Sequence, residues 1–147
     1  MSNPVISIQH LTQKFRGVTA VDNLTFDIAE GEVFGFLGHN GAGKTSTVHM
    51  LTTLAPPASG TAVIAGCDIT TDPMGVRRTI GYVPENVRLY DALTGRENLK
   101  FFAKLSGVDD PAARVEETLD LLDCALIADR RVGDYSKGLR QRIGLAQ

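Results

Sequence analysis

Apolar and polar residues alternate along several short stretches in the first half of the chain. The alternation is clearest over residues 5–9, 24–28 and 61–65, and a two-residue period is typical of a strand with one buried face. Residues 33–37, Val-Phe-Gly-Phe-Leu, are apolar throughout, which is the pattern of a strand covered on both faces. Residues 79–83 predict a further strand, which a proline then ends.

Apolar residues recur at helical spacing elsewhere. Helices are predicted over 43–54, where two prolines stop the helix, and over 73–78. Residues 94–97, Thr-Gly-Arg-Glu, form a capping box, in which the threonine hydroxyl and the glutamate carboxylate each accept a hydrogen bond from the other's backbone N–H. Further helices are predicted after the Asp-Pro pair 110–111 and after Ser136, the expected N-cap of the last helix. Strands and one strong helix therefore occupy about the first ninety residues, and helices the rest.

The composition is that of an ordinary globular protein. The 147 residues are 43% hydrophobic and 22% charged, too apolar for a disordered segment. A net charge of −2 disfavours a nucleic acid as the main partner. No run of about 18 apolar residues occurs, so direct membrane insertion is not expected. Cys67 and Cys124 lack the spacing of paired metal ligands, and small half-buried thiols in a reducing cytosol are favoured over a disulfide or a metal site.

One glycine-rich stretch carries specific chemistry. Residues 38–45, Gly-His-Asn-Gly-Ala-Gly-Lys-Thr, match the phosphate-loop pattern G-x-x-x-x-G-K-[ST] in full. Its glycines let successive backbone N–H groups converge on phosphate oxygens, and the following helix directs its positive end at the same anion. Lys44 places a positive charge beside the β- and γ-phosphates, and the Thr45 hydroxyl can bind Mg²⁺. The residues expected to bind nucleotide here are Gly38, Asn40, Gly41, Ala42, Gly43, Lys44, Thr45 and Ser46.

Three more segments narrow the class of nucleotide-binding protein. Val-Thr-Ala-Val-Asp-Asn-Leu-Thr-Phe occupies 18–26, Ile-Gly-Tyr-Val-Pro-Glu occupies 80–85, and Tyr-Ser-Lys-Gly-Leu-Arg-Gln-Arg occupies 135–142. With the phosphate loop, and in this order, they resemble the ATP-binding subunits of ABC transporters. Residues 135–142, called the signature segment below, stand where that family has its LSGGQ motif. Their form is similar to the drug-resistance and ABC-2 exporter branch.

The resemblance implies an α/β fold of the P-loop NTPase type. We expect a nucleotide-binding core over residues 1–88 with an antiparallel β edge, and a helical subdomain over 89–147. The family's Walker B strand and its general base would follow residue 147, so the resemblance implies that the fold is incomplete at the C-terminus. Residues 33–37 would pair with that strand. We therefore expect this chain alone to bind ATP weakly, to hydrolyse it negligibly and to aggregate.

The resemblance also gives roles to two residues before the phosphate loop. Phe15 would stack on the adenine ring, where the family more often has tyrosine. The alternative for Phe15 is a core position after the first strand. Val21 would pack near the ribose or base, and ordinary core packing is its alternative.

Glu85 stands where the family has the glutamine of its Q-loop, which reaches Mg²⁺ and the attacking water. A carboxylate can also bind Mg²⁺, so Glu85 joins Lys44 as a candidate catalytic residue and Thr45 as a candidate metal ligand. It adds charge beside a triphosphate, which makes the rate of hydrolysis less predictable. The alternative is an exposed glutamate in a turn after a proline.

The signature segment would contact a nucleotide bound by a second subunit. Ser136, Lys137 and Gly138 are the residues expected to do so in trans, because a serine N-cap and a small residue expose N–H groups at a positive helix end. Lys137 departs from the family's more common glycine; its charge either assists the phosphate contact or points to solvent. Most of the arginines nearby are expected to be exposed to solvent and to have no specific role; they are Arg130, Arg131, Arg140 and Arg142.

The predicted function is that of an ATPase subunit with ATP and Mg²⁺ as ligands. It would form a dimer with a second ATP-binding subunit and join an integral membrane permease, which would hold it at the cytoplasmic face of the cell membrane and serve export. Two alternatives stay open: another P-loop enzyme such as a small-molecule kinase, and an ABC-family ATPase that acts on ribosomes or DNA.

Overall fold

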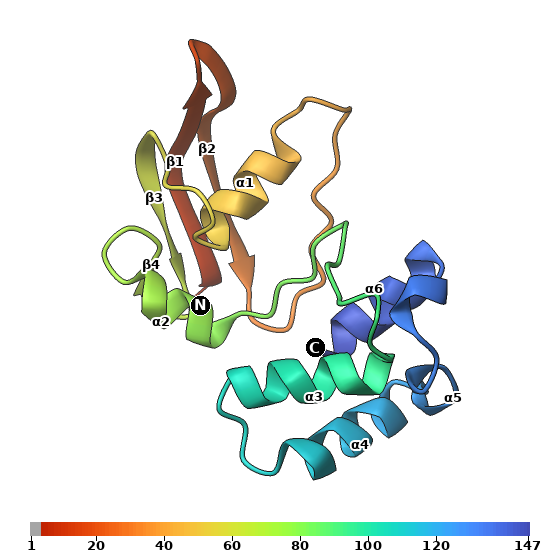
Figure 1. Cartoon of the computed structure of the whole chain (residues 1–147). Helices are drawn as coiled ribbons and strands as arrows, with labels where there is room; N and C mark the ends of the chain where they lie inside the picture. The colour runs from red at the N-terminus through yellow and green to blue at the C-terminus, as the bar shows by residue number, and fades with distance from the viewer. Residues whose placement is uncertain (1–3) are drawn as a thin grey trace. The chain divides into compact units, whose positions relative to one another are not determined.

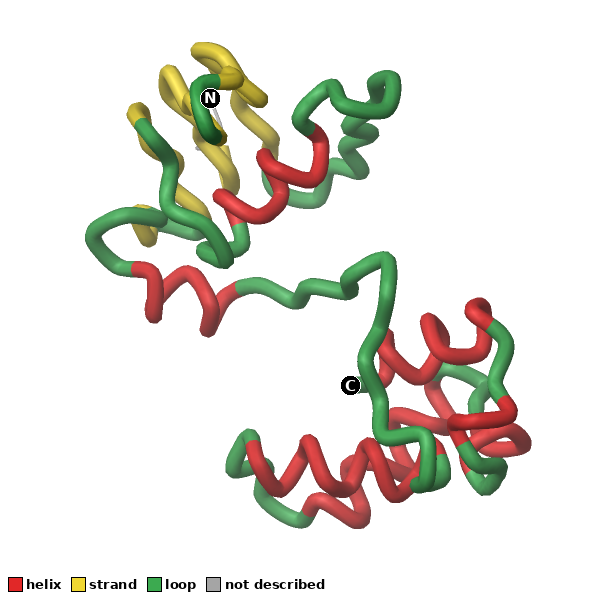
Figure 2. Tube along the Cα trace, turned by 45° about the horizontal axis from the view of Figure 1, so that its top comes forward, coloured by secondary structure: helices red, strands yellow, loops and turns green. Residues whose placement is uncertain are grey.

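The computed structural model describes residues 4–147. The chain divides into two compact units, Met1–Tyr82 and Val83–Gln147. The predicted division into 1–88 and 89–147 remains a prediction. Figure 2 shows that all the strands lie in the first unit and that the second consists of helices and loops.

The first unit is built on a four-stranded sheet with the order β2-β1-β3-β4, in which every neighbouring pair is antiparallel. In Figure 1, α1 lies across one face of this sheet. The elements of this unit are β1 (Pro4–Phe15), β2 (Val18–Ala29), α1 (Lys44–Leu51), β3 (Ser59–Ile64), β4 (Cys67–Asp68) and α2 (Pro73–Thr79).

A tight turn joins the two long strands. Phe15 pairs with Val18 across it, and the two turn residues, Arg16 and Gly17, have φ angles of 44° and 87°. Two positive φ angles are what a two-residue turn needs to match the twist of its strands. Both strands therefore extend well beyond the stretches 5–9 and 24–28 that alternation predicts.

The core of the first unit lies between the sheet and the helices packed on it. Ile8 and Leu11 of β1 and Met50 of α1 are at most 1% exposed and belong to one apolar cluster. Val21 of β2 lies in the same cluster. The sheet thus holds α1 through Met50, near the end of the helix, while Val21 of β2 lies beside Gly43 at its start.

Two predicted strands are wrong. Residues 33–37 form no strand, and Val33 and Leu37 are 100% and 91% exposed. A strand exists only where a neighbour accepts its backbone hydrogen bonds, and no strand within residues 4–147 pairs with this segment. Its aromatic rings instead stack on Phe26 of β2, with centroids 5.1 Å (Phe34) and 6.0 Å (Phe36) away.

The predicted strand over 79–83 is replaced by the end of a helix and an extended segment. Thr79 is the last residue of α2, and its hydroxyl donates to the carbonyl oxygen of Val76 at 2.9 Å. Ile80 is extended, and the residues after it have no ladder partner in the described chain. The helix itself matches the prediction for 73–78 to within one residue.

The second unit packs its helices around an apolar cluster of their own. Leu99, Leu119 and Ile143 come from three helices and are at most 3% exposed. Figure 1 shows α3 and α4 running side by side. The elements are α3 (Gly95–Leu105), α4 (Pro111–Leu121), α5 (Ala125–Ala128), the 3-10 turn η1 (Val132–Asp134) and α6 (Lys137–Ala146).

The helix starts predicted from the sequence are confirmed. Thr94 and Glu97 form both bonds of the capping box at α3, at 3.1 and 2.8 Å. The Asp110 carboxylate accepts from the N–H of Ala113 at the start of α4. Ser136 Oγ accepts from the N–H of Leu139 at 3.3 Å at the start of α6. These caps fix where the signature segment turns into helix.

Candidate functional site

The phosphate-loop residues form a tight bend that leads into α1. Gly41 and Gly43 have φ angles of 86° and 85°, a region that side chains disfavour. Gly43 also packs its Cα against the carbonyl of Ala20 and the side chain of Val21. The bend is therefore built from two glycines that nothing larger can replace without strain, and β2 supports it from below.

Lys44 closes this loop. Its Nζ donates to the carbonyl oxygen of Gly38 at 2.6 Å and to that of His39 at 2.7 Å. The N–H of Ala42 donates to the same carbonyl of His39 at 3.1 Å. An ammonium group has three donors, so two of them shape the loop and a third remains for an anion.

The start of α1 adds further donors. Gly43 is its N-cap, and no side chain of the described residues caps the helix. The first backbone N–H groups of a helix have no partner within the helix, and they carry the positive end of its dipole. An anion seated in the bend of Gly38–Gly43 would meet these groups and the free donor of Lys44 together.

The residues around the phosphate loop suit a Mg²⁺ ion that is bound mainly by nucleotide phosphates. They do not suit a metal ion that is bound by protein side chains alone. Thr45 is exposed at the first turn of α1 and offers one hydroxyl. Within residues 4–147, no group of three or more His, Cys, Asp or Glu side chains could hold a metal ion. Mg²⁺ commonly takes few protein ligands and fills its shell with substrate phosphates and water. A single hydroxyl beside an anion-binding loop matches that donor set.

Phe15 and Val21 differ in exposure. Phe15 is 50% exposed at the end of β1, so the alternative of a core position is wrong for it. Val21 is 7% exposed and packs in the core beside Gly43. An exposed ring suits stacking on a base, whereas Val21 supports the loop from within. Contact of either residue with nucleotide stays a prediction.

In the second unit, Glu85 and Lys137 form an ion pair. Lys137 Nζ lies 2.9 Å from Glu85 Oε1, and both side chains are mostly exposed. The hydrogen bond from Lys137, together with its charge, lowers the pKa of Glu85 below its ordinary value. Glu85 is therefore exposed, as its alternative of a turn glutamate states, and it and Lys137 pair with each other at the surface. No local sequence pattern reveals the pair, because 52 positions separate the two residues.

Two of the four arginines near the signature segment, Arg140 and Arg142, make specific contacts. Arg140 Nη1 lies 2.7 Å from Asp91 Oδ1. Arg142 Nη2 donates to the carbonyl oxygens of Leu122 and Asp123 at 3.2 and 3.0 Å. These two side chains therefore tie α6 to the segments around it.

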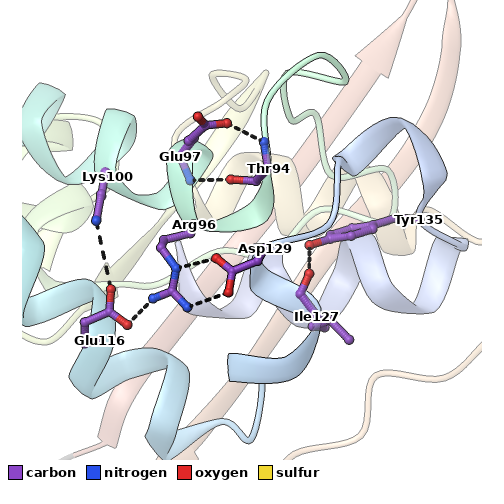
Figure 3. A network of polar contacts seen from close by, with 8 residues as sticks. All are labelled: Thr94, Arg96, Glu97, Lys100, Glu116, Ile127, Asp129 and Tyr135. Atoms are coloured by element: carbon purple, nitrogen blue, oxygen red, sulfur yellow. Dashed lines mark hydrogen bonds and ion pairs between the residues drawn. The ribbon is translucent and has the colours of Figure 1, made fainter.

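Polar contacts link α3, α4 and the residues just before Ser136 (Figure 3). Arg96 binds both Glu116 of α4 and Asp129, with 2.7 Å from its Nε to Asp129 Oδ1. The hydrogen bonds from Arg96 lower the pKa of Asp129. Tyr135 Oη donates to the carbonyl oxygen of Ile127 at 2.5 Å, and burial raises the pKa of this phenol. Tyr135 thus anchors the backbone directly before Ser136.

Asn98 is a structural residue that the sequence pattern did not single out. It is fully buried, and its Oδ1 accepts from the N–H of Tyr90 at 2.7 Å. Its Nδ2 donates to the carbonyl oxygens of Tyr90 and Thr94 at 3.1 and 2.9 Å. A polar residue on the apolar side of an amphipathic helix is the signal that could have found it.

A family model described as ABC transporter matches residues 21–147. The chain is 44% identical over 131 residues to the doxorubicin resistance ATP-binding protein DrrA of Mycobacterium tuberculosis, covering 88% of this chain and 40% of that protein. It is 41% identical over 144 residues to the uncharacterized ABC transporter ATP-binding protein YhcH of Bacillus subtilis, covering 97% and 47%. The chain therefore spans less than half the length of these two relatives.

A solved structure shares the fold. A dimeric ATP-binding cassette in a post-hydrolysis state, bound to ADP and phosphate, superposes with a TM-score of 0.83 at 22% identity. The match covers 96% of this chain and 67% of the other. The predicted fold class, a P-loop ATPase core with an antiparallel sheet and a helical part, is confirmed. None of the helices in residues 4–147 combines the length and the apolar character that a membrane crossing needs.

Proposed function

Because the chain belongs to the ABC transporter family of ATP-binding proteins, we propose that it is the part of an exporter subunit that binds the phosphates of Mg·ATP. The observation that carries the proposal is the geometry of Lys44. Its ammonium group holds two loop carbonyls and retains one donor, beside the uncapped start of α1. A triphosphate supplies the negative charge that such a site favours.

Each residue of the loop has a distinct task in this proposal. The backbone N–H groups of 41–46 bind phosphate oxygens, and Lys44 bridges the β- and γ-phosphates. The Thr45 hydroxyl would hold Mg²⁺, which would supply positive charge beside the phosphates. Phe15 stacks on the adenine, and its half-exposed ring supports this role. Val21 holds Gly43 in place.

The second half of the site acts on another subunit. We propose that two subunits form a dimer, in which Ser136, Lys137 and Gly138 of one contact the nucleotide of the other. The serine-capped start of α6 supports this, because it presents N–H groups at a positive helix end. The related cassette that binds ADP and phosphate is itself described as dimeric.

ATP hydrolysis and transport are proposed for the longer subunit, since the chain spans less than half of its relatives. Glu85 would approach Mg²⁺ and the attacking water and pass the nucleotide state to a membrane permease. The subunit would then lie at the cytoplasmic face of the cell membrane. Export is supported by similarity to a protein named for doxorubicin resistance.

A titration of Mg·ATP against the intact subunit tests the proposal. We expect saturable binding, and Lys44→Ala should weaken it at least about tenfold, because a charge-assisted phosphate contact is lost. Lys104→Ala, a change at an exposed position in α3, is the matched control and should bind as the wild type does. Absence of saturable binding, or equal binding by Lys44→Ala, would contradict the proposed function.

A further inference from the structure

One face of α6 contacts a single short segment, residues 85–91. The contacts fall at Lys137, Arg140, Gln141 and Gly144. The last three follow Lys137 by three, four and seven residues, so all four share one side of the helix. The helix and the segment therefore meet along two turns, and these contacts are called the clasp below.

Four interactions make up the clasp. Lys137 Nζ lies 2.9 Å from Glu85 Oε1, and Gln141 Nε2 donates to the backbone carbonyl oxygen of the same glutamate at 3.4 Å. The remaining two are the Arg140–Asp91 ion pair at 2.7 Å and the packing of Val87 on Gly144, where a Cβ would lie 2.6 Å from a Val87 methyl.

The Glu85–Lys137 pair differs from the rest of the clasp. It lies at the first residue of α6, beside the cap residue Ser136, and both side chains are more than 60% exposed. A cavity of about 290 Å³ borders it. Exposed ion pairs are weak and are readily exchanged for another partner of the same charge.

We propose that the Glu85–Lys137 pair is an exchangeable contact: Lys137 leaves Glu85 for the terminal phosphate of ATP bound by the second subunit, and this frees the Glu85 carboxylate. The inference rests on the proposed function, because it requires the signature segment to face that nucleotide. In this exchange Glu85 acts through Lys137, and the freed carboxylate is then available for its proposed approach to Mg²⁺.

The exchange would make the clasp sensitive to the bound nucleotide. With ADP, which has no γ-phosphate, Lys137 stays with Glu85. With ATP, one cation moves from a carboxylate to a phosphate, and the Arg140–Asp91 pair keeps segment 85–91 on the helix. ATP would therefore break the Glu85–Lys137 pair and leave the Arg140–Asp91 pair intact.

The test measures dimerisation of the intact subunit by sedimentation equilibrium, with a non-hydrolysable ATP analogue or with ADP. Glu85→Gln should tighten the ATP-analogue dimer about threefold, because Lys137 no longer gives up a partner. Lys137→Gln should weaken it about tenfold, because a charge-assisted contact is lost. In the Lys137→Gln background, the threefold gain from Glu85→Gln should disappear, and with ADP Glu85→Gln should not tighten the dimer.

A charge exchange separates this role from a purely structural one. Glu85→Lys combined with Lys137→Glu restores the ion pair but places a carboxylate at the phosphate, so the ATP-analogue dimer should stay weak. Asp91→Asn is the matched control, since it breaks the other ion pair of the clasp, and it should leave the preference for ATP over ADP unchanged.

Two outcomes would overturn the inference while the proposed function stands. One is an independent, additive effect of Glu85→Gln and Lys137→Gln in a subunit that binds Mg·ATP and dimerises. The other is full rescue of dimerisation by the charge exchange. Failure of the wild-type subunit to bind Mg·ATP would overturn the proposed function itself, and the inference with it.

Discussion

The Cα of Gly43 lies so close to the carbonyl oxygen of Ala20 that a methyl group at Gly43 would overlap this oxygen. The residue also has a φ of 85°. We therefore expect Gly43→Ala to displace the phosphate loop from β2 and to weaken Mg·ATP binding at least about tenfold, with a loss of stability of about 2 kcal/mol or more from backbone strain and overlap. Calorimetric titration and thermal unfolding of the intact subunit measure both effects.

Gly41 provides the matched control for this prediction. Its φ is 86°, but a Cβ there would meet no atom within 4 Å. Gly41→Ala should therefore lower the free energy of unfolding by only about 1 kcal/mol, the cost of holding alanine in a left-handed backbone conformation. Equal destabilisation by the two variants would show that contact with Ala20 is not what makes Gly43 necessary.

Asn98 is predicted to be the most sensitive polar position of the helical unit. Asn98→Leu keeps the volume but leaves the N–H of Tyr90 without its acceptor and removes one of the two donors from each of the carbonyl oxygens of Tyr90 and Thr94. The free energy of unfolding should fall by about 3 kcal/mol. Urea denaturation followed by circular dichroism measures this, and amide exchange at Tyr90 should accelerate.

Lys104→Ala, in the same helix at an exposed position, should change the free energy of unfolding by less than about 0.5 kcal/mol. If Asn98→Leu were as mild as this control, the buried amide network would not be the stabilising feature that its geometry indicates.

Asp68 is expected to make the first unit sensitive to acid. Its carboxylate accepts hydrogen bonds from the hydroxyls of Thr70 and Thr61 and from the N–H groups of Thr70 and Thr71, and these hold its pKa far below the ordinary value. Because the folded pKa is the lower one, the stabilisation is complete above about pH 4 and is lost as the pH falls further. Asp68→Asn should lower the free energy of unfolding by about 1–2 kcal/mol at pH 7.

The pH profile decides whether this explanation is right. The difference between wild type and Asp68→Asn should shrink between pH 4 and pH 2 if the carboxylate is responsible, as urea titrations at several pH values would record. Asp27→Asn, at an exposed position of β2, serves as the control and should stay within about 0.5 kcal/mol of wild type. A difference that is the same at every pH would contradict the prediction.

Gly95 and Tyr135 should show coupled effects on stability. A Cβ at Gly95 would lie 2.5 Å from Tyr135 Oη, so Gly95→Ala should be destabilising. Tyr135→Phe removes the hydroxyl and its bond to Ile127, at a loss of about 1 kcal/mol. The double variant should be more stable than the sum of the single effects by about 1 kcal/mol, because the overlap is relieved.

A double-mutant cycle from chemical denaturation measures this coupling. Strict additivity would mean that Gly95→Ala acts through its other close neighbours, the carbonyl oxygen of Ala128 and the Cδ1 of Ile143, both 3.3 Å from the added carbon.

Features encoded in a few consecutive residues could be predicted from the sequence. The capping box of Thr94 and Glu97, the cap at Ser136 and the phosphate loop all depend on local backbone geometry and on side chains three residues apart. The structure reproduces each helix start, and it builds the loop on left-handed glycines as the motif requires.

Features that depend on distant partners could not be predicted in this way. Residues 33–37 have the composition of a buried strand, but pairing decides whether a strand forms, and no neighbour in residues 4–147 provides it. Alternation predicts only part of the long β1–β2 hairpin, because polar residues near its turn interrupt the apolar pattern. The Glu85–Lys137 pair joins exposed charges that lie far apart in the sequence. The chain holds many other charged residues, so the sequence does not show which of them pair.

The spacing of the clasp along α6 makes the helix intolerant of changes in length. One inserted residue turns all that follows by about 100°. An insertion between Lys137 and Arg140 would leave the first ion pair in place and swing Gly144 away from Val87. Substitutions on this face remove one contact each, whereas a single-codon insertion or deletion would displace every contact that follows it along the helix.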